Sequence, residues 1–240
     1  MTKLLFLIPI LTLGLVTCNN KYTTMPTKTD IYKKAFKEDD FPGLDAINQR
    51  EKEIYGLNEK THLATVDPYE YGGEDPLWAI DYYKSKKQQP HFHYITLGLT
   101  HLFYNEEYAE DEINGFGFEL TFRHLPVQGD SSEPVWAANL LTNLSKYVFK
   151  SNNGFDEYHY MSTNGPLRIG TKTNITAVAF YTDPEMKELD TPHGHMKFLQ
   201  VFGITTQEYN DLRSKKYTVE DLLNKHKLTN PLLITDLTRK

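Results

Sequence analysis

The chain has 240 residues, of which 39% are hydrophobic and 13% aromatic, enough to form the core of one large domain or two small ones. Its formal net charge of −6 and the lack of a basic stripe argue against nucleic-acid binding, which depends on many Lys and Arg contacts to phosphates. Cys18 is the only cysteine, so an intramolecular disulfide and a cysteine-based zinc site are excluded.

The N-terminus has the features of an export signal. Lys3 precedes an almost wholly apolar run from residue 4 to 16, which is too short to span a membrane comfortably and predicts a signal peptide over residues 1–17. The tail Leu15-Val16-Thr17-Cys18 resembles the lipobox of bacterial lipoproteins, in which the cysteine is acylated and becomes the new N-terminus. We therefore expect lipidation of Cys18, with palmitate as a label for it, and a lipoprotein anchored to a membrane of the bacterial cell envelope, facing the periplasm or the exterior. An ordinary cleaved signal with an incidental cysteine is the alternative.

Residues 18–40 are polar with little periodicity, which predicts a tether between the lipid and a folded domain over residues 41–240. The elements predicted in the first half of this domain are a helix from Leu44 to Gly56, a short strand from Leu63 to Val66, a turn at Gly72-Gly73, a helix capped by Asp75 that runs through Trp78 and Ile80, and a strand from His91 to Leu99. A strongly acidic loop from Asn105 to Asn114 follows.

The clearest strand runs from Gly115 to Arg123. Aromatic and aliphatic residues from Phe116 to Phe122 alternate with Gly117, Glu119, Thr121 and Arg123, as in a strand with one buried face. This alternation predicts that Glu119 and Arg123 form a surface pair that contributes little to stability.

The second half continues to mix helices and strands. The predicted elements are a helix opened by Pro134 with an apolar stripe that includes Trp136 and Leu140, strands from Ile175 to Tyr181 and from Met196 to Phe202, helices capped by Thr205 with Glu208 and by Thr218, and a closing strand from Leu232 to Thr235. Because no regular βαβ period appears, the pattern favours an α+β fold with a mixed, mostly antiparallel sheet flanked by helices.

Seven collinear blocks resemble the Suppressor of fused family. They are His93-Tyr-Ile-Thr-Leu-Gly-Leu-Thr100, Asn114-Gly-Phe-Gly-Phe-Glu-Leu-Thr-Phe-Arg123, Pro134-Val-Trp-Ala with Leu144-Ser-Lys-Tyr-Val-Phe149, Asp183-Pro-Glu185, Asp190-Thr-Pro-His-Gly194, Phe198-Leu-Gln-Val201 and Leu233-Ile-Thr-Asp236. The resemblance covers the chain from about residue 41 onward and corresponds to the N-terminal one of the two domains of animal members.

This resemblance implies a protein-binding module without chemistry and without a cofactor. Animal members hold a transcription-factor peptide as an added strand, and single-domain bacterial members are presumed immunity proteins beside toxins. The matching positions imply partner contacts at Phe103 and Asp111, with a strand edge near Phe103 as the docking point. The acidic loop, including Glu112, would steer a basic partner. The partner expected is therefore another protein, such as a toxin, met at the membrane.

The alternative is a metal-dependent enzyme or a small-molecule-binding lipoprotein. His91 with His93 and His193 with His195 form two His-x-His pairs, whose side chains share one side of a strand; His159, Glu119 and Asp190 are conceivable third ligands. Spacing alone is weak support for a metal site, and no Gly-x-Ser-x-Gly or phosphate-binding loop is present. We therefore predict no metal ligand and no catalytic residue.

Overall fold

A computed structural model describes residues 25–127 and 135–240 of the chain. The helices are α1 (Lys28–Ala35), α2 (Pro42–Tyr55), α3 (Val135–Ser151), α4 (Thr206–Arg213) and α5 (Val219–Lys227), with short 3-10 helices η1 (Tyr69–Tyr71) and η2 (Glu106–Glu110). The strands are β1 (Lys60–Ala64), β2 (Ala79–Ser85), β3 (His91–Leu97), β4 (Ile113–His124), β5 (Tyr160–Ser162), β6 (Ile175–Thr182), β7 (Glu188–Thr191) and β8 (Gly194–Thr205).

The strands form one sheet in the order β1-β2-β3-β4-β8-β6-β5, with β7 also paired to β8. All neighbours are antiparallel except the central pair β4 and β8, which run parallel. This mixed, mostly antiparallel sheet with flanking helices confirms the α+β fold expected from the sequence.

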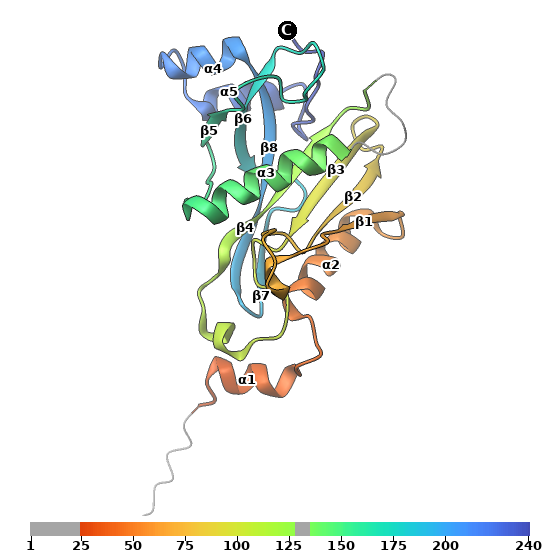
Figure 1. Cartoon of the computed structure of the whole chain (residues 1–240), viewed down its shortest axis with the longest axis vertical. Helices are drawn as coiled ribbons and strands as arrows, with labels where there is room; N and C mark the ends of the chain where they lie inside the picture. The colour runs from red at the N-terminus through yellow and green to blue at the C-terminus, as the bar shows by residue number, and fades with distance from the viewer. Residues whose placement is uncertain (1–24, 128–134) are drawn as a thin grey trace, which may run out of the picture.

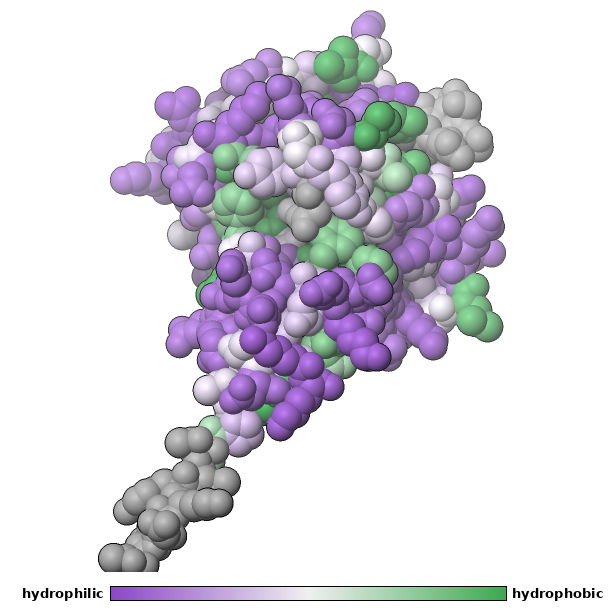
Figure 2. Space-filling view, turned by 60° about the horizontal axis from the view of Figure 1, so that its bottom comes forward, coloured by the Kyte–Doolittle hydropathy of each residue, from purple (hydrophilic) through white to green (hydrophobic). Residues whose placement is uncertain are grey.

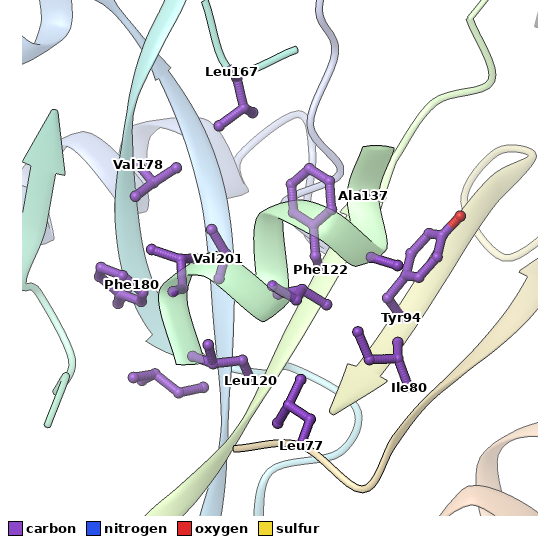
Figure 3. Close-up of a cluster of buried hydrophobic side chains, with 14 of the residues drawn as sticks. Leu77, Ile80, Tyr94, Leu120, Phe122, Ala137, Leu167, Val178, Phe180 and Val201 are labelled. Carbon is purple, nitrogen blue, oxygen red and sulfur yellow. The ribbon is translucent and has the colours of Figure 1, made fainter. Parts of the chain in front are cut away.

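Helices cover both faces of the sheet. α3 crosses one face diagonally, α2 lies against the other near β1 and β2, and α4 with α5 sits at the end opposite α1 (Figure 1). Under α3, Phe122 of β4 and Val201 of β8 belong to the same buried cluster as Ala137 of the helix (Figure 3). A second cluster around Ile47 packs under α2, and a third around Leu223 packs under α4 and α5. Among the described residues, no helix is both long and apolar enough to cross a membrane.

The predicted caps hold the C-terminal helices. Thr205 accepts the backbone N–H of Glu208 while the Glu208 carboxylate accepts that of Thr205, and Thr218 with Asp221 repeats this capping box before α5. The helix predicted to end near Gly56 does so, since Gly56 is its C-terminal cap at a φ of 62°.

Strand β4 is buried on both faces, so the predicted surface pair of Glu119 and Arg123 is wrong. Both side chains are 0% exposed, as is Thr121 between them. The reason is that both faces of the sheet are covered. Helix α3 packs against the face that carries Phe118 and Phe122, and the opposite face lies toward the buried cluster under α2.

Three further expectations need correction. The segment from Asp75 to Ile80 is not helical, because Trp78 donates its N–H to Leu97 O and the chain then pairs along β3 as β2. The segment 232–235 forms only an isolated bridge, between Thr235 and His124. The expected tether contains helix α1, whose Thr27 cap and packing against η2 order it.

Candidate functional site

Phe103 lies in the loop after β3 and is half-buried. Its ring meets Trp78 edge-on with 5.7 Å between centroids and Phe41 with 5.6 Å. The backbone on either side of it is already bonded: Leu102 O accepts the N–H groups of Gly43 and Leu44, and Tyr104 donates to Asp40 O. Phe103 itself lies outside the strands of the sheet, and the group by which it joins the surrounding surface is its side chain.

That side chain lines a surface pocket of about 440 Å³, here called the aromatic pocket. Its walls come from six separate segments: η1, the segment with Pro76 and Trp78 before β2, the loop 98–103, η2, the start of β4 and the end of α3. The aromatic residues among them are Tyr69, Trp78, His101, Phe103, Tyr108, Phe116 and Phe149. Figure 2 looks toward the end of the molecule where α1 lies. The surface seen there is mostly hydrophilic, and apolar residues gather near the middle of the view.

Two glycines allow close backbone packing at the floor of the aromatic pocket. Gly98 has a φ of +132°, and a Cβ there would come within 2.7 Å of Trp78 N; Gly115 has a φ of +57°, and a Cβ there would come within 2.7 Å of Leu99 O. Any other residue at either position would be strained and would push the walls apart.

Beneath this floor, the carboxylate of Glu119 holds the loop in place. It accepts hydrogen bonds from Thr96 Oγ1 (2.6 Å), Gly98 N (2.9 Å), Thr100 N (2.9 Å) and Thr100 Oγ1 (2.7 Å). Burial raises the pKa of Glu119 to about 7 despite these four donors. Glu119 is thus a positioning residue for the pocket.

One wall is a stacked pair of rings. His101 lies parallel to Tyr108 with 3.6 Å between centroids and 8° between planes. Burial, together with neighbouring His193, lowers the pKa of His101, which favours its neutral imidazole. The pocket is therefore suited to an apolar or aromatic group rather than an ion.

Helix α1 covers much of the acidic segment that contains Asp111 and Glu112. Thr29 donates from both N and Oγ1 to Glu110 (2.8 and 2.9 Å), and Lys33 pairs with Glu106 at 2.5 Å. Tyr32 is buried, and its hydroxyl lies 2.7 Å from His193 Nε2. Two of the acidic side chains are thus already matched by the chain's own helix.

Asp111 and Glu112 themselves are not part of the pocket wall. They follow Tyr108, which is in the wall, and their backbone packs against the hairpin between β7 and β8, where His195 donates its N–H to Glu112 O at 2.9 Å. The Glu112 side chain is exposed and that of Asp111 half-buried. The structure therefore brings the three predicted partner-binding residues to one region, with Phe103 inside the pocket and the two acids beside it.

A buried ionic network centred on Asp183 was not predicted from the sequence. Its carboxylate accepts from Arg123 (2.5 and 3.1 Å), Thr121 Oγ1 (2.7 Å) and His93 Nε2 (3.1 Å). Burial alone would raise the pKa of Asp183, but Arg123 and His93 hold it well below its usual range. Arg123, Asp183 and His93 are all 0% exposed, so the network lies inside the fold, where it joins β3 and β4 to the turn after β6.

Neither His-x-His pair is arranged as a metal site. Burial, with Arg123 nearby, lowers the pKa of His93 to about 4, and its other ring nitrogen is bonded to Tyr55 OH. His193 is buried against α1, whereas His195 is 43% exposed and pairs with Asp190 at 2.8 Å. Within residues 25–127 and 135–240, no group of three His, Cys, Asp or Glu residues has the geometry to hold a metal ion.

Comparisons with known proteins agree on one family. A family model described as Suppressor of fused protein (SUFU) matches residues 73–240. The Suppressor of fused homologs of Homo sapiens and Mus musculus are each 33% identical over 209 residues, which covers 82% of this chain and 43% of the relative. The chain thus spans less than half the length of these relatives.

Solved structures show the same likeness. A crystal structure of a Sufu–Fu complex matches with a TM-score of 0.75 and 27% identity, covering 84% of this chain and 92% of that one. Drosophila Suppressor of Fused gives 0.74 and 27%, with 85% and 52% covered. A Suppressor of fused homolog from Neisseria gonorrhoeae, with a TM-score of 0.55 and 11% identity over 82% of this chain and 95% of that one, shares the fold.

Proposed function

The chain belongs to the Suppressor of fused family, and from this premise we propose that it is a non-enzymatic domain that binds and sequesters another protein. One matching structure is a complex between a family member and a second protein, Fu. That precedent supports a protein partner for this chain as well.

The aromatic pocket is the observation that carries the proposal. A pocket of about 440 Å³ with aromatic walls and a rigid glycine floor accommodates one or two apolar side chains of a partner. Burying one such side chain contributes about 1.5–3 kcal/mol. Aromatic anchors in preformed pockets dominate the binding energy of many protein interfaces. Phe103 is the wall residue we assign to this contact.

Asp111 and Glu112 supply charge beside the pocket. Because Lys33 of α1 pairs with Glu106 and Thr29 hydrogen-bonds to Glu110, these two acids are among the carboxylates in the segment that remain for a partner. Exposed charges mainly speed encounter and exclude wrong partners, while packed apolar contacts slow dissociation. We therefore assign steering to the acids and retention to the pocket.

The burial of the ionisable network supports binding over catalysis. A catalytic group has to reach a substrate, yet His93, Arg123 and Asp183 are sealed within the sheet. Their hydrogen bonds are directed at each other and at backbone N–H groups. Such a network fixes strand positions, which is what a rigid binding surface requires.

We further propose that the partner is a toxin delivered by a neighbouring cell, and that the domain meets it while anchored through lipid on Cys18. Cys18 lies outside the described residues; the apolar run before it and the lipobox-like tail support the anchor. Two or three acyl chains would hold the protein firmly, since each buried CH₂ contributes about 0.8 kcal/mol. A domain held outside the cytoplasm would intercept an incoming effector.

The test starts in the source organism, grown together with competitor cells. The full-length chain is cross-linked there to any protein that it binds, and the product is captured. The captured protein is then purified, and its Kd is measured against wild type, Phe103→Ala and the control Tyr181→Ala, which changes a half-buried aromatic residue of β6 outside the pocket. We expect Phe103→Ala to weaken binding roughly tenfold, mostly through dissociation, and Tyr181→Ala to leave it unchanged. Equal loss in both variants, or a small molecule as the only ligand, would contradict the assignment. Protection of growth when the two proteins are co-expressed tests the toxin identity.

A further inference from the structure

The sheet has unpaired strand edges, and one of them lies beside a groove next to α3. Three strands of the described chain have an edge that no other strand covers: β1, β7 and β5. Proteins usually protect such edges with charge, proline or bulges, because unpaired backbone groups invite other strands.

Two of these edges are protected. β1 carries Lys60, which pairs with buried Glu51 and Asp81 at 3.0 and 2.8 Å. β7 carries two acidic residues, and Arg50 donates to its Glu188 O at 3.1 Å. Both edges therefore disfavour strand addition by an apolar segment.

β5 has no such protection. It reads Tyr160-Met161-Ser162, with no charge and no proline. His159 O accepts from Phe180 N and Thr163 N donates to Thr176 O, both at 3.0 Å. Because hydrogen-bonding positions alternate along an antiparallel strand, the N–H and C=O groups of Tyr160 and Ser162 point away from β6, toward the open edge.

A groove runs beside this edge, here called the α3–β5 groove. It consists of two adjoining hollows of about 570 and 500 Å³ that share Tyr147 and Met161. On the α3 side it is lined by Trp136, Leu140, Asn139, Asn143 and Tyr147. Among the described residues that line it, Arg168 alone carries a full charge, and its guanidinium lies over the Trp136 ring at 5.7 Å. In a chain with 24% charged residues, this mostly uncharged lining favours an occupant that is itself mostly uncharged.

We propose that the α3–β5 groove binds an extended, uncharged segment of a protein partner, which adds to β5 as a new edge strand. The backbone of Tyr160 and Ser162 would pair with that of the segment. Alternate side chains of the segment would enter the groove next to Met161, while the others would lie on the Tyr160 side, where Tyr209 of α4 packs at 5.8 Å. Main-chain bonds give affinity in this mode, and the pockets for alternate side chains give selectivity.

This surface is separate from the aromatic pocket, with which it shares no lining residue. A partner with an apolar anchor would bind in the aromatic pocket, and a partner with an extended segment would bind in the α3–β5 groove. A partner that carries both features could bind at both surfaces. The experiment therefore has to distinguish the two surfaces.

The probe is a phage-displayed library of random heptapeptides, selected on the immobilised full-length chain; the strongest peptide is synthesised and its Kd measured by calorimetry. Ser162→Pro removes an outward N–H without removing a bond to β6, so the fold survives while the edge is blocked. Its matched control is Ala64→Pro, which makes the same change at an outward N–H of the β1 edge, since Thr65 N is the group that pairs with Trp78 O. Asn143→Glu places a charge in the groove, and Lys150→Glu is its control on the same helix outside the groove.

We expect Ser162→Pro and Asn143→Glu each to weaken binding by roughly tenfold or more, and both controls to change it by less than about twofold. Selected peptides should be uncharged and of alternating apolar pattern. The proposal is overturned if no peptide is selected, if the peptide binds Ser162→Pro as tightly as wild type, or if only Phe103→Ala weakens it. It is also overturned if the wild-type chain is a dimer that Ser162→Pro dissociates, because the occupant would then be a second copy.

Discussion

Replacing Glu119 should separate its structural role from its charge. Glu119→Ala leaves the N–H groups of Gly98 and Thr100 and the Thr100 hydroxyl without their acceptor in a fully buried site. An orphaned buried donor costs about 1–3 kcal/mol, and partial hydration of the new cavity reduces the sum, so we expect a loss of about 3–5 kcal/mol in the free energy of unfolding. Glu119→Gln keeps an oxygen for these donors and should cost far less.

The same pair of variants gives a pH signature. The pKa of Glu119 is about 7 in the folded protein against 4.5 when exposed, so the folded state binds the proton more tightly. Its contribution is fully present below about pH 4.5 and is lost as the pH rises through about 7, which amounts to roughly 3 kcal/mol at about 1.4 kcal/mol per pH unit. Gln does not titrate, so Glu119→Gln should match wild type near pH 5 and become relatively more stable toward pH 8.

The assay is urea unfolding of wild type and both variants at several pH values between 5 and 8. Burial also raises the pKa of Glu51 to about 7, which adds to the slope of every curve, and the difference between wild type and Glu119→Gln cancels it. Parallel curves for these two proteins would refute the assignment of the proton to Glu119. A loss below about 1 kcal/mol for Glu119→Ala would refute its role as the support of the pocket floor.

Three other outcomes follow from the structure. Asp183→Asn should destabilise the fold by about 3–5 kcal/mol in the same urea assay, because it removes one of the two carboxylates that pair with the fully buried Arg123 and leaves only Glu185; a loss under 1 kcal/mol would mean that the pair is not the main support of the network. Changing Asp111 and Glu112 together to Lys should slow association with the captured partner at low salt and flatten its salt dependence, as measured by surface plasmon resonance, with dissociation unchanged; an effect on dissociation alone would argue against steering. Labelled palmitate should be incorporated into the wild-type chain and not into Cys18→Ser, and equal labelling of the two would exclude the anchor at that residue.

The sequence predicted β4 and its apolar face because the alternation from Phe116 to Phe122 is a local pattern. It could not predict that the Glu119 and Arg123 face is also buried, since that cover comes from segments far along the chain. A strand with Phe on one face and both Glu and Arg on the other was the available sign of an internal ionic network. Such charges are seldom fully buried unless they are paired, which is why the pattern favoured the surface.

The site was predictable only in part for the same reason. Phe103 emerged from the family resemblance, whereas the pocket around it needs Trp78, Tyr108 and Phe149, which only the tertiary structure brings together. Helix α1 was missed because eight residues show too little periodicity, although Thr27 with Asp30 gave a capping signal. The strand β2 was mistaken for a helix because the Asp75-Pro76 cap signal is local, while pairing with β1 and β3 decides its conformation.

The parallel pairing of β4 with β8 determines when, during synthesis of the chain, the sheet can be completed. Residues 118–122 lie beside residues 197–201, so the centre of the sheet closes only after about five-sixths of the chain has left the ribosome. Contacts this distant in sequence slow folding, because the intervening chain has to be ordered before they form. Until then β4 has β3 on one side and an open edge on the other. A nascent chain that folds this late stays unfolded during most of its synthesis, which would suit the export that we propose, because an exported chain passes a translocation channel before it folds.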